Sequence, residues 1–440
     1  MSFKRWFVLL LTVSFLWSLS GCNGLTMDTE QMIRPPQLTG KMKEIDQALS
    51  GGVKGAYKLL YPSAGDRRSA IITEDVDGDG ILEAFAFFTK EAERTANVSI
   101  ALVRQIEGEW QLQAQQSVEA GGVECVEFCD LDGSGWKSIL VGLEVFGGTD
   151  KLLAVYNTTD GKLSQRMKQQ YNNFLCCNLD EDDKNEIFIE SISPTDGLHR
   201  AALFSLTEEG ITELSTCLLD KTVKTVGTVT LSELSSGQPA IYMDEAKGTG
   251  AITEVVYLSK GMLTNPLLDA EIGENIRTLH AATLTSTDIN MDGTLEIPVS
   301  IPLPVLPGTE EWESLSITGW FSFNGERLDV KQRTFVNASE KYMITFPEKW
   351  TDKILLKRDA DKRSLTVYTV DASTQTLGES LAVVRAFTEE QWNKARREGT
   401  AYKEISRNDE FVYGVMLSAD NAELSVPLED FRKLFTVKEW

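Results

Sequence analysis

A nine-residue acidic pattern recurs along this chain and constrains its fold more than any other feature. It reads DVDGDGILE at 75–83 and DINMDGTLE at 288–296. Two degraded copies, which depart from this pattern, start at Asp130 and Asn178. Each copy runs directly into a short apolar segment of the kind that forms a β-strand. The chain is therefore built from repeats in which an acidic loop precedes a strand.

The spacing of the copies indicates a regular repeat. Their starts at residues 75, 130, 178 and 288 are separated by 55, 48 and 110 residues, and 110 is twice 55. A further copy is therefore expected near residue 233, where ELSSGQP keeps the turn residues and the following strand but has lost most acidic side chains. A repeat of about 50 residues is typical of propellers, solenoids or arrays of small modules.

The number of strands per repeat favours a propeller. The runs after the first loop lie at 81–88, 97–103, 110–116 and 122–128, and those of the next unit near 138–145, 152–157, 162–169 and 173–178. Polar or Gly-containing turns separate them, and four strands per repeat are typical of a propeller blade. The sequence thus predicts a mainly β protein with about five blades over residues 56–335.

Closure of the ring is expected to use the start of the chain. The last unit, 296–335, has three evident strands, and its fourth is uncertain. Residues 68–74 stand immediately before the first loop and can supply that strand, which would remove two open sheet edges. Six or more blades stay open if residues 57–61 and the C-terminal region add strands.

From about Asn337 the repeat stops, which predicts a separate small α+β domain over 336–440. Strands are expected at 364–369, 380–387 and 410–417, and helices at 389–398 and 428–434.

The acidic loops have the ligand chemistry of calcium sites. Alternate residues of a tight loop can direct oxygens at one ion, and a glycine permits the sharp turn. Position 7 would add a backbone carbonyl and position 9 a closing glutamate, whereas an EF-hand closes at position 12. The predicted structural calcium ligands are Asp75, Asp77, Asp79, Ile81 and Glu83, and Asp288, Asn290, Asp292, Thr294 and Glu296. Weaker sets are Asn178, Asp180, Asp182 and Glu186, and Asp130, Asp132 and Ser134.

These loops resemble the FG-GAP or VCBS calcium loops of integrin-type propellers. The N-terminal stretch from Arg34 through Arg67 to Gly80 is also similar to uncharacterised VCBS-repeat lipoproteins of Firmicutes. The resemblance implies structural calcium between blades and implies no reaction. Ser134, Ser138 and the copy near 233 depart from the pattern, which puts ion binding there in doubt.

The first residues indicate export and lipid anchoring. Lys4 and Arg5 precede an uncharged apolar run, 6–19, that ends in LSGC at Cys22. This is a signal peptide, and its end resembles the bacterial lipobox, in which the cysteine is acylated and becomes the N-terminus. An ordinary signal peptide or an uncleaved anchor are the alternatives. A tether and short helix are expected over 23–55, with the protein on the outer face of the cytoplasmic membrane.

Charge and cysteine content limit the partners and the redox chemistry. The net charge of −23 disfavours nucleic acid and anionic lipid as partners of the body and favours cations. The other five cysteines contain no CxxC pair, so buried free thiols are favoured, and one disulfide stays open. They are Cys125, Cys129, Cys176, Cys177 and Cys217.

No catalytic motif is evident. His199 and His280 are the only histidines and are expected to be solvated or packed. The prediction is a binding or scaffold module without catalysis, with an unknown protein or glycan ligand and an unknown oligomeric state. The alternative is a surface glycan hydrolase that uses acidic residues of the propeller channel. Tryptophans that could line a ligand surface, or simply pack, are Trp110, Trp136, Trp312, Trp320, Trp350 and Trp392.

Overall fold

The computed structural model describes residues 40–91, 97–148, 150–303, 315–371, 376–418 and 423–439. The predicted signal peptide and Cys22 lie outside this part of the chain. Helix α3 (Lys41–Gly52) comes first and buries Ile45 and Leu49 against the first sheet. Within the described ranges no helix has both the length and the apolar character needed to cross a membrane.

The described strands form six antiparallel sheets in chain order. The first contains β1 (Tyr57–Leu59), β2 (Ile71–Glu74), β3 (Glu83–Lys90), β4 (Asn97–Ile106) and β5 (Glu109–Glu119). The second contains β6 (Gly122–Asp130), β7 (Lys137–Glu144), β8 (Lys151–Asn157) and β9 (Ser164–Tyr171). The third contains β10 (Asn173–Cys177), β11 (Glu186–Ile192), β12 (His199–Thr207) and β13 (Gly210–Leu218).

The remaining three sheets are also antiparallel. The fourth contains β14 (Thr225–Glu233), β15 (Pro239–Lys247), β16 (Gly250–Ser259), β17 (Met262–Thr264) and β18 (His280–Ala281). The fifth contains β19 (Ile297–Pro302), β20 (Ser316–Phe323), β21 (Leu328–Asn337), β22 (Tyr342–Thr345) and β28 (Phe435–Val437). The sixth contains β23 (Ile354–Asp359), β24 (Ser364–Asp371), β25 (Thr376–Phe387), β26 (Lys403–Arg407) and β27 (Val412–Leu417). The prediction of a mainly β chain with several antiparallel sheets is confirmed.

Inner strands are apolar on both faces because each sheet is covered on both sides. In β3, Phe85 and Phe87 pack toward the second sheet, while Ala86 and Phe88 pack in the cluster that holds α3. This division follows from the two-residue alternation of side chains along a strand. Outer strands such as β5 alternate between exposed and half-buried positions instead.

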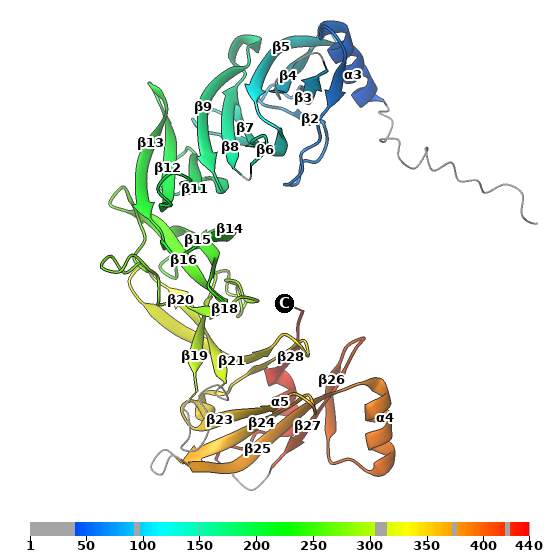
Figure 1. Cartoon of the computed structure of the whole chain (residues 1–440), viewed down its shortest axis with the longest axis vertical. Coiled ribbons are helices and arrows are strands. Elements are labelled where there is room, and N and C mark those ends of the chain that lie inside the picture. The colour runs from blue at the N-terminus through cyan, green and yellow to red at the C-terminus, as the bar shows by residue number, and fades with distance from the viewer. Residues whose placement is uncertain are drawn as a thin grey trace, which may run out of the picture.

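Successive sheets pack face to face, and each adjacent pair shares one apolar core. Figure 1 shows that the series follows an open arc, with the first sheet at one end and the sixth at the other. A disulfide between Cys129 of β6 and Cys176 of β10 joins the second sheet to the third, with Cα atoms 6.0 Å apart. The expectation of free thiols is therefore wrong for this pair, because face-to-face packing brings two distant strands together. Cys125, Cys177 and Cys217 are free.

The predicted closure of the ring is wrong. Strand β2, which was expected to complete the last blade, pairs with β3, so that Ile72 lies opposite Phe85. Each of the first four loop copies thus joins two neighbouring strands of one sheet, β2 to β3, β6 to β7, β10 to β11 and β14 to β15. Pairing of neighbouring strands needs only a short loop closure, which costs less entropy than joining the two ends of the chain. The fifth sheet continues beyond β21 into β22 and β28, which come from the C-terminal region.

The C-terminal region is continuous with the fifth sheet. The predicted boundary at 335/336 falls inside β21, and Phe335, Tyr342 and Phe435 share one core with the sixth sheet. The predicted helices are confirmed as α4 (Glu389–Glu398) and α5 (Leu428–Leu434). Helix α4 begins with a capping box between Thr388 and Gln391.

Candidate metal loops and a buried polar centre

Three of the acidic loops share one closing arrangement. The glutamate at position 9 is buried, with 2, 2 and 0% of its surface exposed in the first, third and fifth copies. Its carboxylate accepts a hydrogen bond from the backbone N–H at position 2, which fixes it at the mouth of the loop. These bonds join Glu83 to Val76 (3.1 Å), Glu186 to Leu179 (2.9 Å) and Glu296 to Ile289 (3.1 Å).

Hydrogen bonds within each loop orient the earlier side chains. Asp75 accepts hydrogen bonds from Gly78 N at 2.8 Å and Gly80 N at 3.0 Å, and Gly80 has a φ of +83°. Only glycine adopts that backbone conformation without strain, which is why the sequence carries it there. Asp79 accepts from the N–H of Ile81 at 2.7 Å. Backbone amides of the first loop therefore fix the orientation of Asp75 and Asp79.

The first loop brings Asp75, Asp77 and Glu83 together, with one carboxylate oxygen of each within 4.8 Å of the others. Arg104 of β4 forms ion pairs with Asp77 and, at 3.1 Å, with Glu83. Burial raises the pKa of Glu83, and the hydrogen bond from Val76 and the guanidinium of Arg104 oppose that rise. A basic side chain already balances part of the charge in this loop.

The third loop gathers Asp180, Asp182 and Glu186 in the same way, although the sequence made it a weaker candidate. Asn178 Oδ1 is buried beside them and has no hydrogen-bond partner in the described part of the chain. Burial, followed by the charges of Asp180 and Asp182, raises the pKa of Glu186. The third loop therefore offers oxygen ligands for a cation. No arginine forms an ion pair with them among the described residues, unlike Arg104 in the first loop.

The fifth loop is less complete than its sequence suggested. The amide nitrogen of Asn290 faces the carboxylates and donates to Asp292 at 2.9 Å and Glu296 at 3.0 Å. Asp288 accepts from Asp292 N and Gly293 N, and the N–H of Thr294 donates to Asp292 at 3.0 Å. A donor therefore stands where the prediction placed an oxygen ligand.

The second and fourth copies lack a closing carboxylate. Asp130 keeps the loop turn by accepting from Gly133 N at 2.9 Å, Ser134 donates its hydroxyl to Asp132, and Ser138 stands at position 9. The copy near 233 is a plain hairpin between β14 and β15, closed by Leu234 N and the carbonyl of Gln238 at 2.8 Å.

Neighbouring loops contact one another along the series of sheets. The N–H of Lys137, at the end of the second loop, donates to the carbonyl of Val76 in the first at 2.7 Å. Asn185 of the third loop donates to the carbonyl of Asp130 in the second at 2.7 Å. An ion that stiffens one loop would therefore also stiffen the contact between two sheets.

A second polar centre, which the sequence did not single out, lies between the third and fourth sheets. Glu190, His199, Glu245 and Glu254 are exposed by no more than 1%. His199 Nε2 lies 2.8 Å from Glu190 Oε1, and Nδ1 lies 3.1 Å from the carbonyl oxygen of Asp220. The sequence predicts that His199 is either solvated or packed, and it is packed. The missed signal was the presence of glutamates inside the apolar strands β11, β15 and β16.

The two nearest carboxylates of this centre have opposite pKa shifts. Burial opposes ionisation of Glu190, but its contacts with His199, Glu245 and Asn173 together outweigh burial and lower the pKa of Glu190. Burial, followed by the neighbouring Glu190, raises the pKa of Glu245 far above its usual value. Two carboxylates in one apolar site favour a single negative charge unless a cation joins them.

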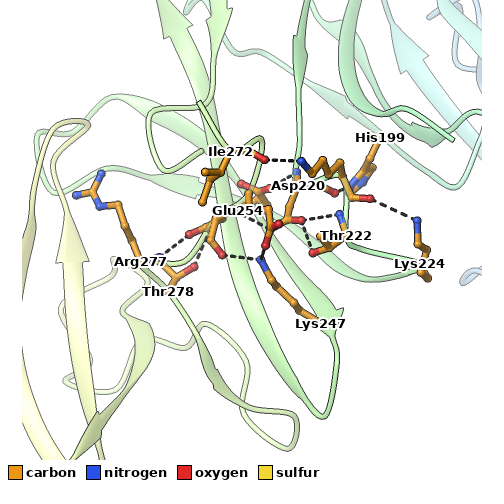
Figure 2. A network of polar contacts seen from close by, with 12 residues as sticks. His199, Asp220, Thr222, Lys224, Lys247, Glu254, Ile272, Arg277 and Thr278 are labelled. Carbon is orange, nitrogen blue, oxygen red and sulfur yellow. Dashed lines mark hydrogen bonds and ion pairs between the residues drawn. The ribbon is translucent and has the colours of Figure 1, made fainter. Parts of the chain in front are cut away.

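Asp220 connects this centre to an ion-paired network, shown in Figure 2. Its Oδ2 lies 2.6 Å from Lys247 Nζ, and its Oδ1 accepts from Thr222 N at 2.7 Å. Its own N–H donates to Glu254 Oε1 at 2.7 Å. Burial opposes ionisation of Asp220, but the Lys247 and Thr222 bonds outweigh it and lower the pKa of Asp220. The network fixes the carbonyl that orients His199.

The candidate ligand-facing tryptophans separate by burial. Trp320, Trp350 and Trp392 are core residues exposed by 0, 1 and 3%, whereas Trp136 is 39% exposed. Trp136 lines a hollow beside the second loop with Asn157, Thr158 and Leu206. Trp312 lies outside the described residues.

No family model matches the chain, and no curated protein matches it. It is similar to a rhamnogalacturonan lyase of Bacillus licheniformis, with 12% identity, a TM-score of 0.33, and 75% of this chain and 72% of that chain covered. It is also similar to the periplasmic gluconolactonase of Pseudomonas aeruginosa, with 12% identity, a TM-score of 0.30, and 70% of this chain and 83% of that chain covered. A third similar structure is the Dos1 propeller, with 13% identity, a TM-score of 0.28, and 72% of this chain and 79% of that chain covered. Similarities at this level assign neither a closed ring nor an activity to this chain.

Proposed function

We propose that this chain is a calcium-stabilised binding or scaffold module without catalysis of its own, held outside the bacterial cytoplasmic membrane by a lipid on Cys22. The observation that carries the calcium part is the third loop. Asp180, Asp182 and Glu186 converge there beside the unpartnered oxygen of Asn178. Carboxylate and amide oxygens from one short loop are the ligands that calcium takes in proteins.

The contacts between loops give the ion a structural role. Asn185 joins the third loop to the backbone of Asp130 in the second, and Lys137 joins the second to Val76 in the first. Calcium that orders the third loop would favour this chain of contacts over the unfolded state. Extracellular calcium modules bind at about 10⁻⁴ to 10⁻³ M, a range that suits an exported protein.

Thermal unfolding of the full exported chain in calcium and in EGTA tests this proposal. Calcium is expected to raise the Tm of the native chain and to have a smaller effect on Asp182→Asn. Asp183→Asn removes the same charge from an exposed position of the same loop and should respond like the native chain. Equal Tm values in calcium and EGTA for the native chain would contradict the calcium proposal.

The burial of the second polar centre supports a role without catalysis. Glu190, Glu245 and Glu254 converge away from the acidic loops, as the carboxylates of a hydrolase would, but are exposed by no more than 1%. A glycosidase acid and base must touch the sugar on both sides of the scissile bond. The full chain is therefore expected to release no reducing ends from bacterial and plant polysaccharides. Release that is lost in Glu245→Gln would favour the hydrolase instead.

The hollow at Trp136 supports the binding role. A half-exposed indole beside polar Asn157 and Thr158 can stack on a sugar ring or pack on a peptide. Binding to arrays of glycans and peptides should be lost in Trp136→Ala. It should be kept in Leu214→Ala, which removes a side chain that is 47% exposed elsewhere. Equal binding by both variants would show that the ligand does not bind at Trp136.

The anchor has its own test. Metabolic labelling with a fatty acid should mark the native chain and not Cys22→Ala, which should also leave the membrane fraction. Fatty-acid label that persists in Cys22→Ala would contradict the proposal that Cys22 carries the lipid.

A further inference from the structure

The buried polar centre between the third and fourth sheets is separate from the acidic loops. Glu190 lies on β11, His199 begins β12, and Glu245 lies on β15. Glu190 is four residues beyond Glu186 of the third loop, or about 13 Å along an extended strand. One ligand atom from each of the three side chains lies within 4.8 Å of the others.

Glu245 is the unexplained member of this group. It is 1% exposed, and neither of its carboxylate oxygens accepts a hydrogen bond of ordinary geometry among the described residues, although Glu190 and the N–H of Gly227 lie beside it. Its neighbours differ, because Glu190 accepts from Asn173 and lies 2.8 Å from His199 Nε2, and Glu254 accepts from Asp220 N–H and Asn265. A buried carboxylate without a partner is costly, so these oxygens require a proton or a cation.

The orientation of His199 fits a cation. A carbonyl oxygen can only accept, so Nδ1 donates to Asp220, and Nε2 faces the two carboxylates. Histidines that bind metal through one ring nitrogen are commonly held in this way through the other. Asp220 is fixed by Lys247 and Thr222, so the ring has little freedom to turn.

We propose that Glu190, His199 and Glu245 bind one divalent transition-metal ion of the Zn²⁺ or Mn²⁺ class, which ties the third sheet to the fourth. Two carboxylates and one imidazole suit such an ion, whereas calcium takes oxygen ligands. Either carboxylate can bind through one or both oxygens, so three residues can complete a four-coordinate shell. The ion would balance the two buried negative charges.

The spacing of the ligands is compatible with this ion. Ligand atoms at about 2.1 Å from zinc lie about 3.0 to 3.4 Å from one another, depending on coordination geometry. Nε2 and Glu190 Oε1 are 2.8 Å apart, and the Glu245 oxygen is within the 4.8 Å limit. Small side-chain rotations suffice to bring all three to bonding distance.

The burial of the site determines when the ion binds. Side chains exposed by no more than 1% leave no open route, so the ion enters as the sheets come together and leaves when they unfold. The ion is therefore part of folding and is expected to resist chelators while the protein is native.

Elemental analysis of the full native chain, followed by unfolding in guanidinium with a chromogenic chelator, tests the proposal. We expect about one zinc or manganese ion per chain, released as the protein unfolds and not before. His199→Gln and Glu245→Gln should each lose it. Glu254→Gln, an equally buried glutamate whose oxygens are already partnered, should keep it, and Asp182→Asn should lose calcium alone.

A second measurement avoids reliance on variants that fail to fold. The native chain, unfolded, stripped of metal and refolded with Co²⁺, should acquire visible absorption from a nitrogen and oxygen ligand set. A native chain that contains no transition metal and takes up none of Zn²⁺, Mn²⁺ or Co²⁺ on refolding overturns the proposal and assigns a proton to Glu245. Calcium is measured separately, so failure of the loop sites leaves this result unaffected.

Discussion

Glu186 and Leu179 are joined across the third loop by a 2.9 Å hydrogen bond from the backbone N–H to the buried carboxylate. The same bond recurs between Glu83 and Val76 in the first loop, in a different sheet. In both loops a backbone N–H of the loop holds the closing carboxylate in place. The loop is therefore arranged for a cation before one binds, which reduces the ordering cost of binding.

Glu186→Gln should reduce the stabilisation that calcium provides. With a dissociation constant of about 10⁻⁴ M, free calcium at about 1 mM stabilises the native state by about 1.4 kcal/mol through mass action. The variant should lose most of this increment, as measured by urea unfolding with and without calcium. Glu181→Gln, an exposed change in the same loop, should retain it. If both variants lose the same stabilisation by calcium, the effect comes from the net charge of the loop and not from a ligand role of Glu186.

Stability without calcium should fall as the pH rises above the usual glutamate range. Burial raises the folded-state pKa of Glu83, Glu186 and Glu296, so the folded state binds more protons than the unfolded state between the two pKa values. Unfolding free energy therefore decreases with pH through that window. Calcium replaces the proton and should flatten the decrease. A matched comparison is Tm against pH in EGTA for the native chain and Glu186→Gln, where the variant should show the shallower slope.

Loss of the Cys129–Cys176 disulfide should destabilise the chain. The bond closes a segment with a sequence separation of 47 residues, and the chain-entropy relation gives about 4 kcal/mol as its contribution. Cys176→Ala should lower the urea midpoint, and a reductant should lower that of the native chain to a similar value. Cys217→Ala removes a free thiol and serves as the control. A reductant that leaves the native midpoint unchanged would count against a bridge.

Lys247→Met should be strongly destabilising. Lys247 pairs at 2.6 Å with the fully buried Asp220, and removal of one partner leaves an uncompensated charge, which costs about 3 to 5 kcal/mol. Lys224→Met, at an exposed position, should change the unfolding free energy by less than about 0.5 kcal/mol. Urea unfolding measures both. If Asp220→Asn together with Lys247→Met is no more stable than the sum of the single changes, the two residues are not coupled.

Features that depend on a few consecutive residues were predictable. The residue pattern of 389–398 predicted a helix that the structure places at Glu389–Glu398. The acidic loops fold as tight turns because Asp75 and Asp130 bond to amides within their own segments. Which loop has the best cation geometry was not predictable, because Arg104 enters the first loop from another strand and Asn290 turns its nitrogen inward.

The sequence by itself determined the repeated loops, most of the strands and the C-terminal helices, because these follow from local hydrogen bonding and alternation. Only the tertiary structure decided that β2 pairs with β3 and that the series of sheets stays open, since the same strand can satisfy its backbone in either sheet. It also decided that Cys129 meets Cys176 and that Glu190, His199 and Glu245 share one buried centre. Those contacts join residues far apart in the chain, and face-to-face packing of neighbouring sheets is what brings them together.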